Sequence, residues 1–348
     1  MATIRDVARE AGVSVASASR ALNDRDNVTP ATRDKVRAAA QRLVYVPHSG
    51  ARNLTRQKTD SIGVVLPDLF GEFFSELIRG IDRVAYAHGL QLLLSNMHGN
   101  PHEATSAVRA MRGRVDGLLV MVPDAQDEHL LDALGGAVPT VLLNCHDQRG
   151  RVASVGIDNE GGARAMTRFL VARGYRRIAF ISGPRHNRDS AARQAGFFSA
   201  LAEATGERNP LVIAGDFSEA SGAEAARLLI AARLPVDAIF CANDMMAVGC
   251  CAVLADAGID VGGDVGVAGF DDIPIAHYTA PGLTTMNARI AELGAAAAEK
   301  LIQLSADPEL ARDSTILAPQ LIARDSTARR TASHRAETHQ IFEKGSSS

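Results

Sequence analysis

From Ser61 onward, short apolar runs alternate with helix-like segments, and this alternation limits the possible folds more than any other feature of the chain. The runs are rich in β-branched residues, as SIGVVLP at 61–67 illustrates. Strands that alternate with helices of roughly 10–15 residues indicate parallel sheets covered by helices. The other expected strands lie at 90–95, 117–122, 140–144, 153–157, 177–182, 211–214, 238–242 and 265–270.

These segments form two successive sets, so we predict an α/β body made of two doubly wound lobes. Ligands of doubly wound folds bind outside the carboxyl ends of the strands. The cleft between the lobes is therefore the expected pocket.

The first 46 residues have a different pattern, that of three short helices. Thr3, Ser14 and Thr29 each precede a helical apolar pattern and are typical N-cap residues. The short turn at 11–14 (Ala-Gly-Val-Ser) joins the first two helices into a helix-turn-helix. The second helix of such a motif enters the DNA major groove by its N-terminal end. A small bundle that binds another protein is the alternative.

The distribution of charge along the chain supports the DNA-binding interpretation of the head. Residues 1–58 carry 11 Lys/Arg and 5 Asp/Glu, whereas the remaining residues carry 26 and 35. A basic head on an acidic body indicates a polyanion-binding module fused to a second domain.

No apolar run reaches the ~18 residues that span a bilayer. The start of the chain has no secretory apolar segment, and four cysteines do not make a disulfide scaffold. We therefore expect a cytoplasmic protein without a membrane partner.

Five side chains of the second helix are expected to face outward: Val15, Ala16, Ser17, Ser19 and Arg20. Arginine pairs with guanine O6 and N7, and small apolar side chains contact thymine methyl groups.

The motifs TIRDVA at 3–8, AGVS at 11–14 and SRALN at 19–23 resemble the head of the lactose-repressor (LacI/GalR) family of transcription regulators, and further similarity extends to about residue 327. The resemblance implies that Val15 and Ala16 select operator bases and that Arg20 is the recognition arginine. It also implies DNA contacts by Thr3, Ser14, Ser17, Ser19 and Asn23.

The same resemblance implies a domain plan. The helix-turn-helix domain takes residues 1–46, a hinge helix and linker take 47–58, and two lobes of the periplasmic-binding-protein type follow. The expected N-terminal lobe is 61–157 plus 287–313, and the expected C-terminal lobe is 158–286 plus 314–328. Within the hinge, Leu54 matches a leucine that wedges into the minor groove, and wedges of this kind kink DNA. Arg52 is expected to contact phosphates, and an ordinary linker is the alternative for this segment.

Residues 329–348 are polar and are expected to be disordered. They hold no apolar heptad, so a homodimer is favoured over a coiled-coil tetramer. Two-fold symmetry then predicts a pseudo-palindromic double-stranded operator.

Polar and aromatic side chains follow the expected strands and are candidates for effector binding: Phe73, Phe74, Asp158, Arg193, Phe217, Asn243 and Asp271. Carboxylates, an amide and a guanidinium can pair with vicinal hydroxyls, while aromatic walls complete a small-ligand site. The resemblance implies that Arg193, Asn243 and Asp271 hold the effector. The alternatives are helix capping for the aspartates and core packing for the phenylalanines. Glu72, just before Phe73, is either an acceptor at the cleft mouth or solvated.

The resemblance thus implies a repressor of carbohydrate genes that a small sugar releases from its operator. The alternative is a regulator that responds to a purine or nucleoside, which alters or strengthens DNA binding. The chain has no dinucleotide fingerprint after its first expected strand, no P-loop and no G-x-S-x-G elbow. We therefore expect no enzyme activity, cofactor or metal.

Overall fold

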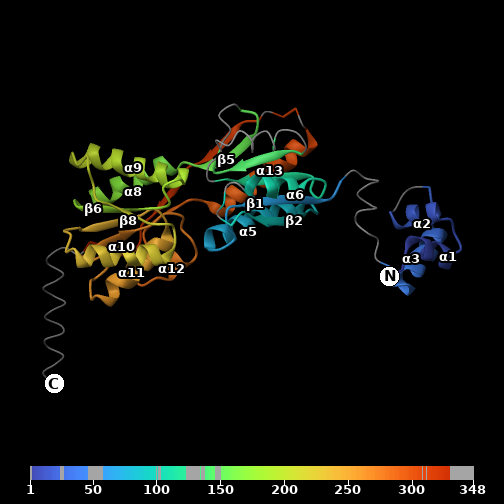
Figure 1. Ribbon diagram of the computed structural model, residues 1–348, viewed down its shortest axis with the longest axis horizontal. Helices are drawn as coiled ribbons and strands as arrows, with labels where there is room; N and C mark the ends of the chain where they lie inside the picture. Colours follow the sequence, from blue (N-terminus) through green and yellow to red (C-terminus); the bar gives the residue numbers. More distant parts are fainter. Residues whose placement is uncertain are drawn as a thin grey trace, which may run out of the picture. The chain divides into compact units, whose positions relative to one another are not determined.

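A computed structural model describes residues 2–23, 27–45, 58–98, 100, 103–122, 134, 138–145, 150–307, 309–310 and 312–329 (Figure 1). The chain divides into two compact units, Met1–Asp60 and Ser61–Ser348, which we call the head and the body. None of the described helices is long and apolar enough to cross a membrane.

The head is a three-helix unit whose helices begin at the expected caps. Its helices are α1 (Ile4–Ala11), α2 (Val15–Leu22) and α3 (Pro30–Arg42). Thr3 and Asp6 form a reciprocal capping box on α1, and Ser14 and Thr29 cap the other two helices. A small apolar core, including Val7, Ala18 and Val36, holds the three helices together.

The first lobe of the body is built on a parallel sheet in the order β11-β5-β4-β3-β1-β2. Its strands are β1 (Ser61–Leu66), β2 (Gln91–Asn96), β3 (Gly117–Met121), β4 (Thr140–Leu143), β5 (Ala153–Ile157) and β11 (Ser314–Leu317). Its helices are α5 (Glu72–Ala87), α6 (Ala104–Met111) and α13 (Ile290–Ala306). All of β1 is buried, and Val64 and Val65 pack into different core clusters because alternate side chains point to opposite faces.

The second lobe has a parallel sheet in the order β7-β6-β8-β9. Its strands are β6 (Ile178–Ser182), β7 (Val212–Ala214), β8 (Ala238–Cys241) and β9 (Gly266–Ala268). Helices α8 (Asn159–Ala172) and α9 (Arg188–Thr205) cover one face, and α10 (Glu219–Ala231) and α11 (Asp244–Asp256) cover the other (Figure 1). The short α12 (Ile275–Tyr278) follows β9.

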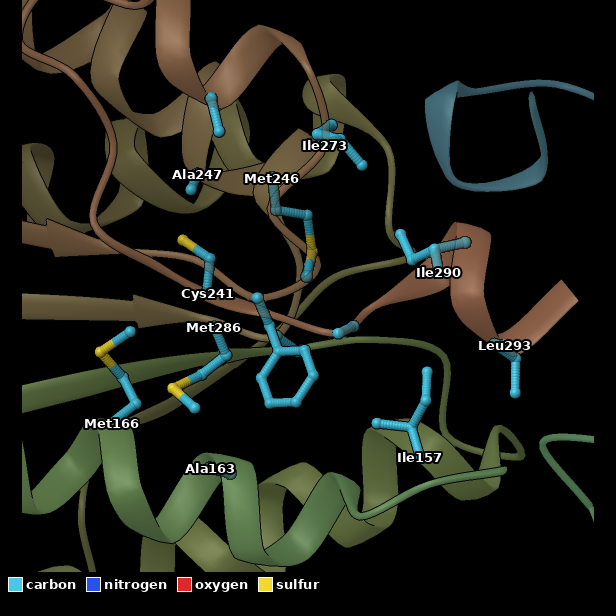
Figure 2. Close-up of a cluster of buried hydrophobic side chains, with 14 of the residues drawn as sticks. Ile157, Ala163, Met166, Cys241, Met246, Ala247, Ile273, Met286, Ile290 and Leu293 are labelled. Carbon is cyan, nitrogen blue, oxygen red and sulfur yellow. The ribbon is translucent and has the colours of Figure 1, made fainter. Parts of the chain in front are cut away.

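The chain passes between the lobes three times. It crosses after β5 (Ala153–Ile157), between β10 (Thr285–Asn287) and α13, and between β11 and β12 (Gln320–Ile322). Strands β10 and β12 pair antiparallel, and a 3₁₀ turn at Asp325–Thr327 follows β12. Side chains near these crossings belong to one continuous apolar cluster, in which Ile157, Met286 and Ile290 lie (Figure 2). The lobes therefore share part of their core.

One expected boundary is wrong. The domain plan gives residues 314–328 to the C-terminal lobe, yet β11 pairs in parallel with β5, with Ser314 opposite Ser154. Strand β11 forms backbone hydrogen bonds along the edge of the first sheet. The chain therefore passes to the second lobe only after Leu317.

Candidate functional site

The head presents the N-terminal part of α2 on its surface. Val15, Ala16 and Arg20 are exposed, whereas Ala18 and Ala21 on the opposite face are buried. Arg20 has no hydrogen bond or ion pair with any part of the chain that the structure describes. An apolar pair and an unengaged guanidinium on one exposed helix face fit base contacts in a major groove.

The other predicted DNA-binding residues of the head have structural roles of their own. Thr3 and Ser14 are N-caps, and the Ser17 hydroxyl lies 2.9 Å from that of Ser14. The Asn23 amide donates to the Ser19 carbonyl at 2.8 Å, which helps to end α2. These contacts explain why the residues occur where they do, and any phosphate contact would be additional. Arg52 and Leu54 lie outside the described residues.

In the body, a buried arginine lies at the centre of the predicted effector site. Arg193 on α9 is 3% exposed. Its Nε donates to Asn159 Oδ1 at 2.8 Å, its Nη1 donates to the Ala242 carbonyl at 2.6 Å, and its Nη2 lies 3.1 Å from Asp271 Oδ1. The guanidinium carbon also lies 3.9 Å from the centre of the Phe270 ring, a cation–π distance. The guanidinium is thus held rigidly before any ligand binds.

The contacts of Arg193 belong to a longer hydrogen-bonded chain. Asp189 accepts from Asn159 Nδ2 at 2.9 Å and from Asn144 Nδ2 at 3.1 Å. Asn144 follows β4 of the first lobe, whereas Asp189 is on α9 of the second. We call Asn144, Asp189, Asn159, Arg193 and Asp271 the polar relay; it links the two lobes.

Both ends of the polar relay carry an unsatisfied acceptor. Asn144 Oδ1 and Asp271 Oδ1 are buried and accept no hydrogen bond from the described residues. The contact of Asp271 Oδ1 with Arg193 is an ion pair that lacks the angles of a hydrogen bond. Buried polar atoms without a partner are rare in native proteins. Each end also lines a hollow, of about 340 Å³ beside Asn144 and about 310 Å³ beside Asp271, and such volumes suit small ligands.

Burial raises the pKa of three carboxyl groups in this region, those of Asp189, Asp244 and Asp271. It raises the pKa of Asp271 to about 6, although the positive charge of Arg193 acts in the opposite sense. Burial likewise raises the pKa of Asp189, and it raises that of Asp244 well above the usual range. Asp271 therefore takes up its proton at a higher pH than an exposed aspartate does.

Backbone strain gathers at the same place. Of the nine non-glycine residues with positive φ in the described ranges, four belong to this region: Asn144, Phe217, Asp271 and Asp272. Such conformations cost energy and cluster at functional sites.

Asp158 and Asn243, two further predicted effector residues, also act as helix caps. Asp158 is exposed and caps α8, and it lines the hollow beside Asn144. Asn243 is buried, caps α11 and donates to the Phe217 carbonyl. Neither of the two hollows is lined by Arg193, Asn243 or Phe217.

The three phenylalanines are half-buried. Phe73 and Phe74 meet edge to face, with ring centres 5.3 Å apart at 85°, and Phe217 packs against the core cluster. The capping and core-packing alternatives thus describe part of what these residues do.

The candidate effector residues did not include three members of the polar relay: Asn144, Asp189 and Asn159. Asn144 is a polar residue that directly follows a strand, and this is the feature that selected Asp158 and Asn243. The same feature could therefore have identified Asn144. Within the described parts of the chain, no group of three His, Cys, Asp or Glu side chains could hold a metal ion.

Comparison with known proteins agrees with this architecture. Residues 3–48 match the lacI family of bacterial regulatory proteins, and residues 167–327 match the periplasmic binding protein-like domain. The chain is 35% identical to the HTH-type transcriptional regulator GalR of Escherichia coli K12, over 97% of this chain and 99% of that protein. It is 36% identical to the HTH-type transcriptional repressor PurR of Photobacterium profundum, over 94% and 98%.

Two solved structures are also similar. One is the lac repressor dimer bound to operator and the anti-inducer ONPF, with a TM-score of 0.84 and 30% identity over 94% of this chain and 99% of that one. The other is the complex of the transcriptional regulator CelR with cellobiose, with a TM-score of 0.70 and 31% identity over 94% and 100%.

Proposed function

Because the chain belongs to the lacI family and is a DNA-binding transcriptional regulator, we propose that it is a dimeric repressor of carbohydrate genes. A small sugar between the lobes releases it from a pseudo-palindromic operator. The observation that carries the sugar assignment is the polar relay with an unsatisfied buried acceptor at each end.

A sugar suits this site because its hydroxyls both donate and accept. Asp271 Oδ1 and Asn144 Oδ1, each beside its own hollow, can accept from ligand hydroxyls, while Arg193 lines neither hollow and holds Asn159 and Asp271 in place. A ligand that leaves such groups unpaired is rejected strongly. The structure of a CelR–cellobiose complex on the same fold is consistent with a sugar ligand.

The aromatic residues supply the apolar part of the proposed site. Here Phe73 and Phe74 meet edge to face, and Phe217 packs against Gly183 and the core cluster. These half-buried rings provide an apolar wall.

A dimer is supported by exposed apolar side chains around α5 and α12. Leu69, Phe70 and Tyr86 flank or belong to α5, and Ile275 and Tyr278 belong to α12. Phe70 and Tyr278 are 76% and 81% exposed. Apolar side chains this exposed are available for contact with a second copy of the chain, and a lac repressor dimer on operator shares the fold.

The hinge remains part of the proposal, with Leu54 as the minor-groove wedge and Arg52 as a phosphate contact. Replacing Leu54 by Ala removes the wedge and leaves the body intact. Specific DNA binding should weaken while ligand binding by the body stays unchanged. Equal operator affinity for the variant and the wild type would show that Leu54 is only linker.

Calorimetry tests the ligand class. Titration of the full chain with mono- and disaccharides and with nucleosides should yield binding for one sugar only. The Asp271→Asn variant keeps the shape of the side chain but loses its charge, so it should bind that sugar at least ~10-fold more weakly. Asp82→Asn, an exposed change on α5, is the control. A nucleoside that binds while every sugar fails would overturn the sugar assignment.

A further inference from the structure

Glu72 makes a contact that the proposed function does not use. It is the first residue of α5 in the first lobe, and it is only partly exposed. Its Oε2 accepts a hydrogen bond from the backbone N–H of Ile275, at 3.0 Å. Ile275 begins α12 in the second lobe, so the bond joins the two lobes.

The segment that Glu72 holds is the one that carries Asp271. Ile275 follows Asp271 closely along the chain, and Pro274 between them has no N–H to donate. On its other side the segment is tied to the second lobe, because the N–H of Ile273 donates to Asp244 Oδ2 at 3.0 Å. The Asp271 segment is therefore bonded to both lobes at neighbouring residues.

Position makes this contact sensitive to movement of the lobes. Asp244 and β9 move with the second lobe, whereas α5 packs against α13 of the first lobe so closely that the Ala291 carbonyl leaves no room for a Cβ on Gly80. A change in the separation of the lobes would therefore stretch the Glu72–Ile275 bond, displace the Asp271 segment or force Glu72 into another rotamer. Glu72 also starts the helix that lies only a short loop after β1, the first strand beyond the head.

We propose that Glu72 is a clasp that sets the separation of the lobes when no effector is bound, and that it couples the Asp271 segment to the affinity of the protein for DNA. A ligand that binds Asp271 acts against this clasp. The coupling to DNA rests on the proposed function; the existence of the clasp does not.

Hydrogen exchange measures the clasp without ligand or DNA. In the full chain, the variant Glu72→Ala removes the acceptor, Glu72→Gln keeps an uncharged acceptor, and Asp82→Ala removes an exposed charge from the same helix. Loss of a hydrogen bond to a charged group should speed exchange in the peptide that contains Ile275 by roughly tenfold. We expect this in Glu72→Ala, a smaller change in Glu72→Gln and none in Asp82→Ala. Equal exchange in Glu72→Ala and the wild type would overturn the clasp.

Coupling to DNA is measured with a duplex that the wild-type protein selects from a random library. Without ligand, Glu72→Ala should bind this duplex about fivefold more weakly than the wild type, within the usual range of coupling between sites. Glu72→Gln should fall between them, and Asp82→Ala should equal the wild type. Faster exchange with unchanged DNA affinity would make the bond structural only and refute the regulatory role. Failure of the wild type to select any duplex would refute the proposed function, and the exchange data would still decide whether the clasp exists.

Discussion

Val15, Ala16 and Arg20 on α2 are exposed and contact little of the protein, whereas Arg193, Asn243 and Asp271 in the body are buried and bonded to it. The two regions therefore prepare for their ligands in different ways. A DNA-binding helix can leave its side chains in water because the helix itself fixes their positions. The polar groups of the body are already bonded in the polar relay, so on our proposal a ligand acts by changing contacts that already exist.

The largest effect should come from breaking the relay at its centre. Arg193→Met leaves Asp271 as a buried charge without a partner, which costs about 3–5 kcal/mol of unfolding free energy. Urea denaturation of the full chain measures this in the transition of the body. Arg20→Ala serves as the contrast and should change stability by less than ~0.5 kcal/mol. A similarly small loss in Arg193→Met would mean that the relay is not a rigid element.

Arg20→Ala should act on DNA instead. Loss of a bidentate contact to guanine costs about 1–3 kcal/mol of operator affinity and relaxes specificity at one base pair. Binding to a set of singly substituted operators, at one fixed salt concentration, measures both quantities. If the variant discriminates among operators as the wild type does, Arg20 contacts phosphate only.

A pH change should affect the cleft and spare the head. The folded-state pKa of Asp271 is raised to about 6, so the carboxylate predominates at pH ~7.5 and is largely protonated at pH ~5. A protonated Asp271 loses an acceptor for ligand hydroxyls. At one pH unit below the pKa only about a tenth of the molecules carry the carboxylate, so sugar binding should be about tenfold weaker. Calorimetry at both pH values checks this. Asp271→Asn should bind weakly at both, and an equal decline with pH in that variant would assign the effect to another group.

The same raised pKa has a consequence for stability. Asp271 binds its proton more tightly in the folded state than in the unfolded state. The stabilisation of the folded state that this proton provides is fully present below the ordinary pKa of 3.8 and is lost as pH rises through about 6.

The smallest expected effect is in the head. Helix α3 ends in a Schellman motif, in which Val44 N–H donates to the Gln41 carbonyl and Tyr45 N–H to the Ala40 carbonyl. Val44 occupies the position that favours glycine, with φ of 47°. Val44→Gly should relieve this strain and stabilise the head by up to ~1 kcal/mol. Thermal unfolding followed by exchange in α3 measures it. Destabilisation would show that the greater freedom of glycine in the unfolded chain outweighs the relieved strain, since the Val44 side chain is 82% exposed.

Much of the architecture could be predicted because it depends on local signals. The three caps of the head and the β-branched runs of the body are short patterns with one strong structural meaning each, and most strand ends fall within one or two residues of expectation. The lobe of β11 was predicted wrongly because an isolated edge strand carries no information about its partner.

The site was harder to predict because its contacts are long-range. Asn144 and Asp189 are 45 residues apart and Asn159 and Arg193 are 34 apart, and no local pattern pairs them. Asp158 and Asn243 illustrate the opposite difficulty. Each follows a strand and precedes a helix, and the same position suits a cap and a ligand contact equally well.

The central claim is that a sugar in the relay of the body controls DNA binding by the head. Fluorescence anisotropy of an operator duplex selected by the protein, at fixed salt, tests it with and without the sugar found by calorimetry. Salt must be fixed because phosphate contacts make the affinity depend on it. The account predicts that the sugar releases the duplex from the wild type and leaves Asp271→Asn bound. Release of both proteins at the same sugar concentration, or of neither, would contradict it.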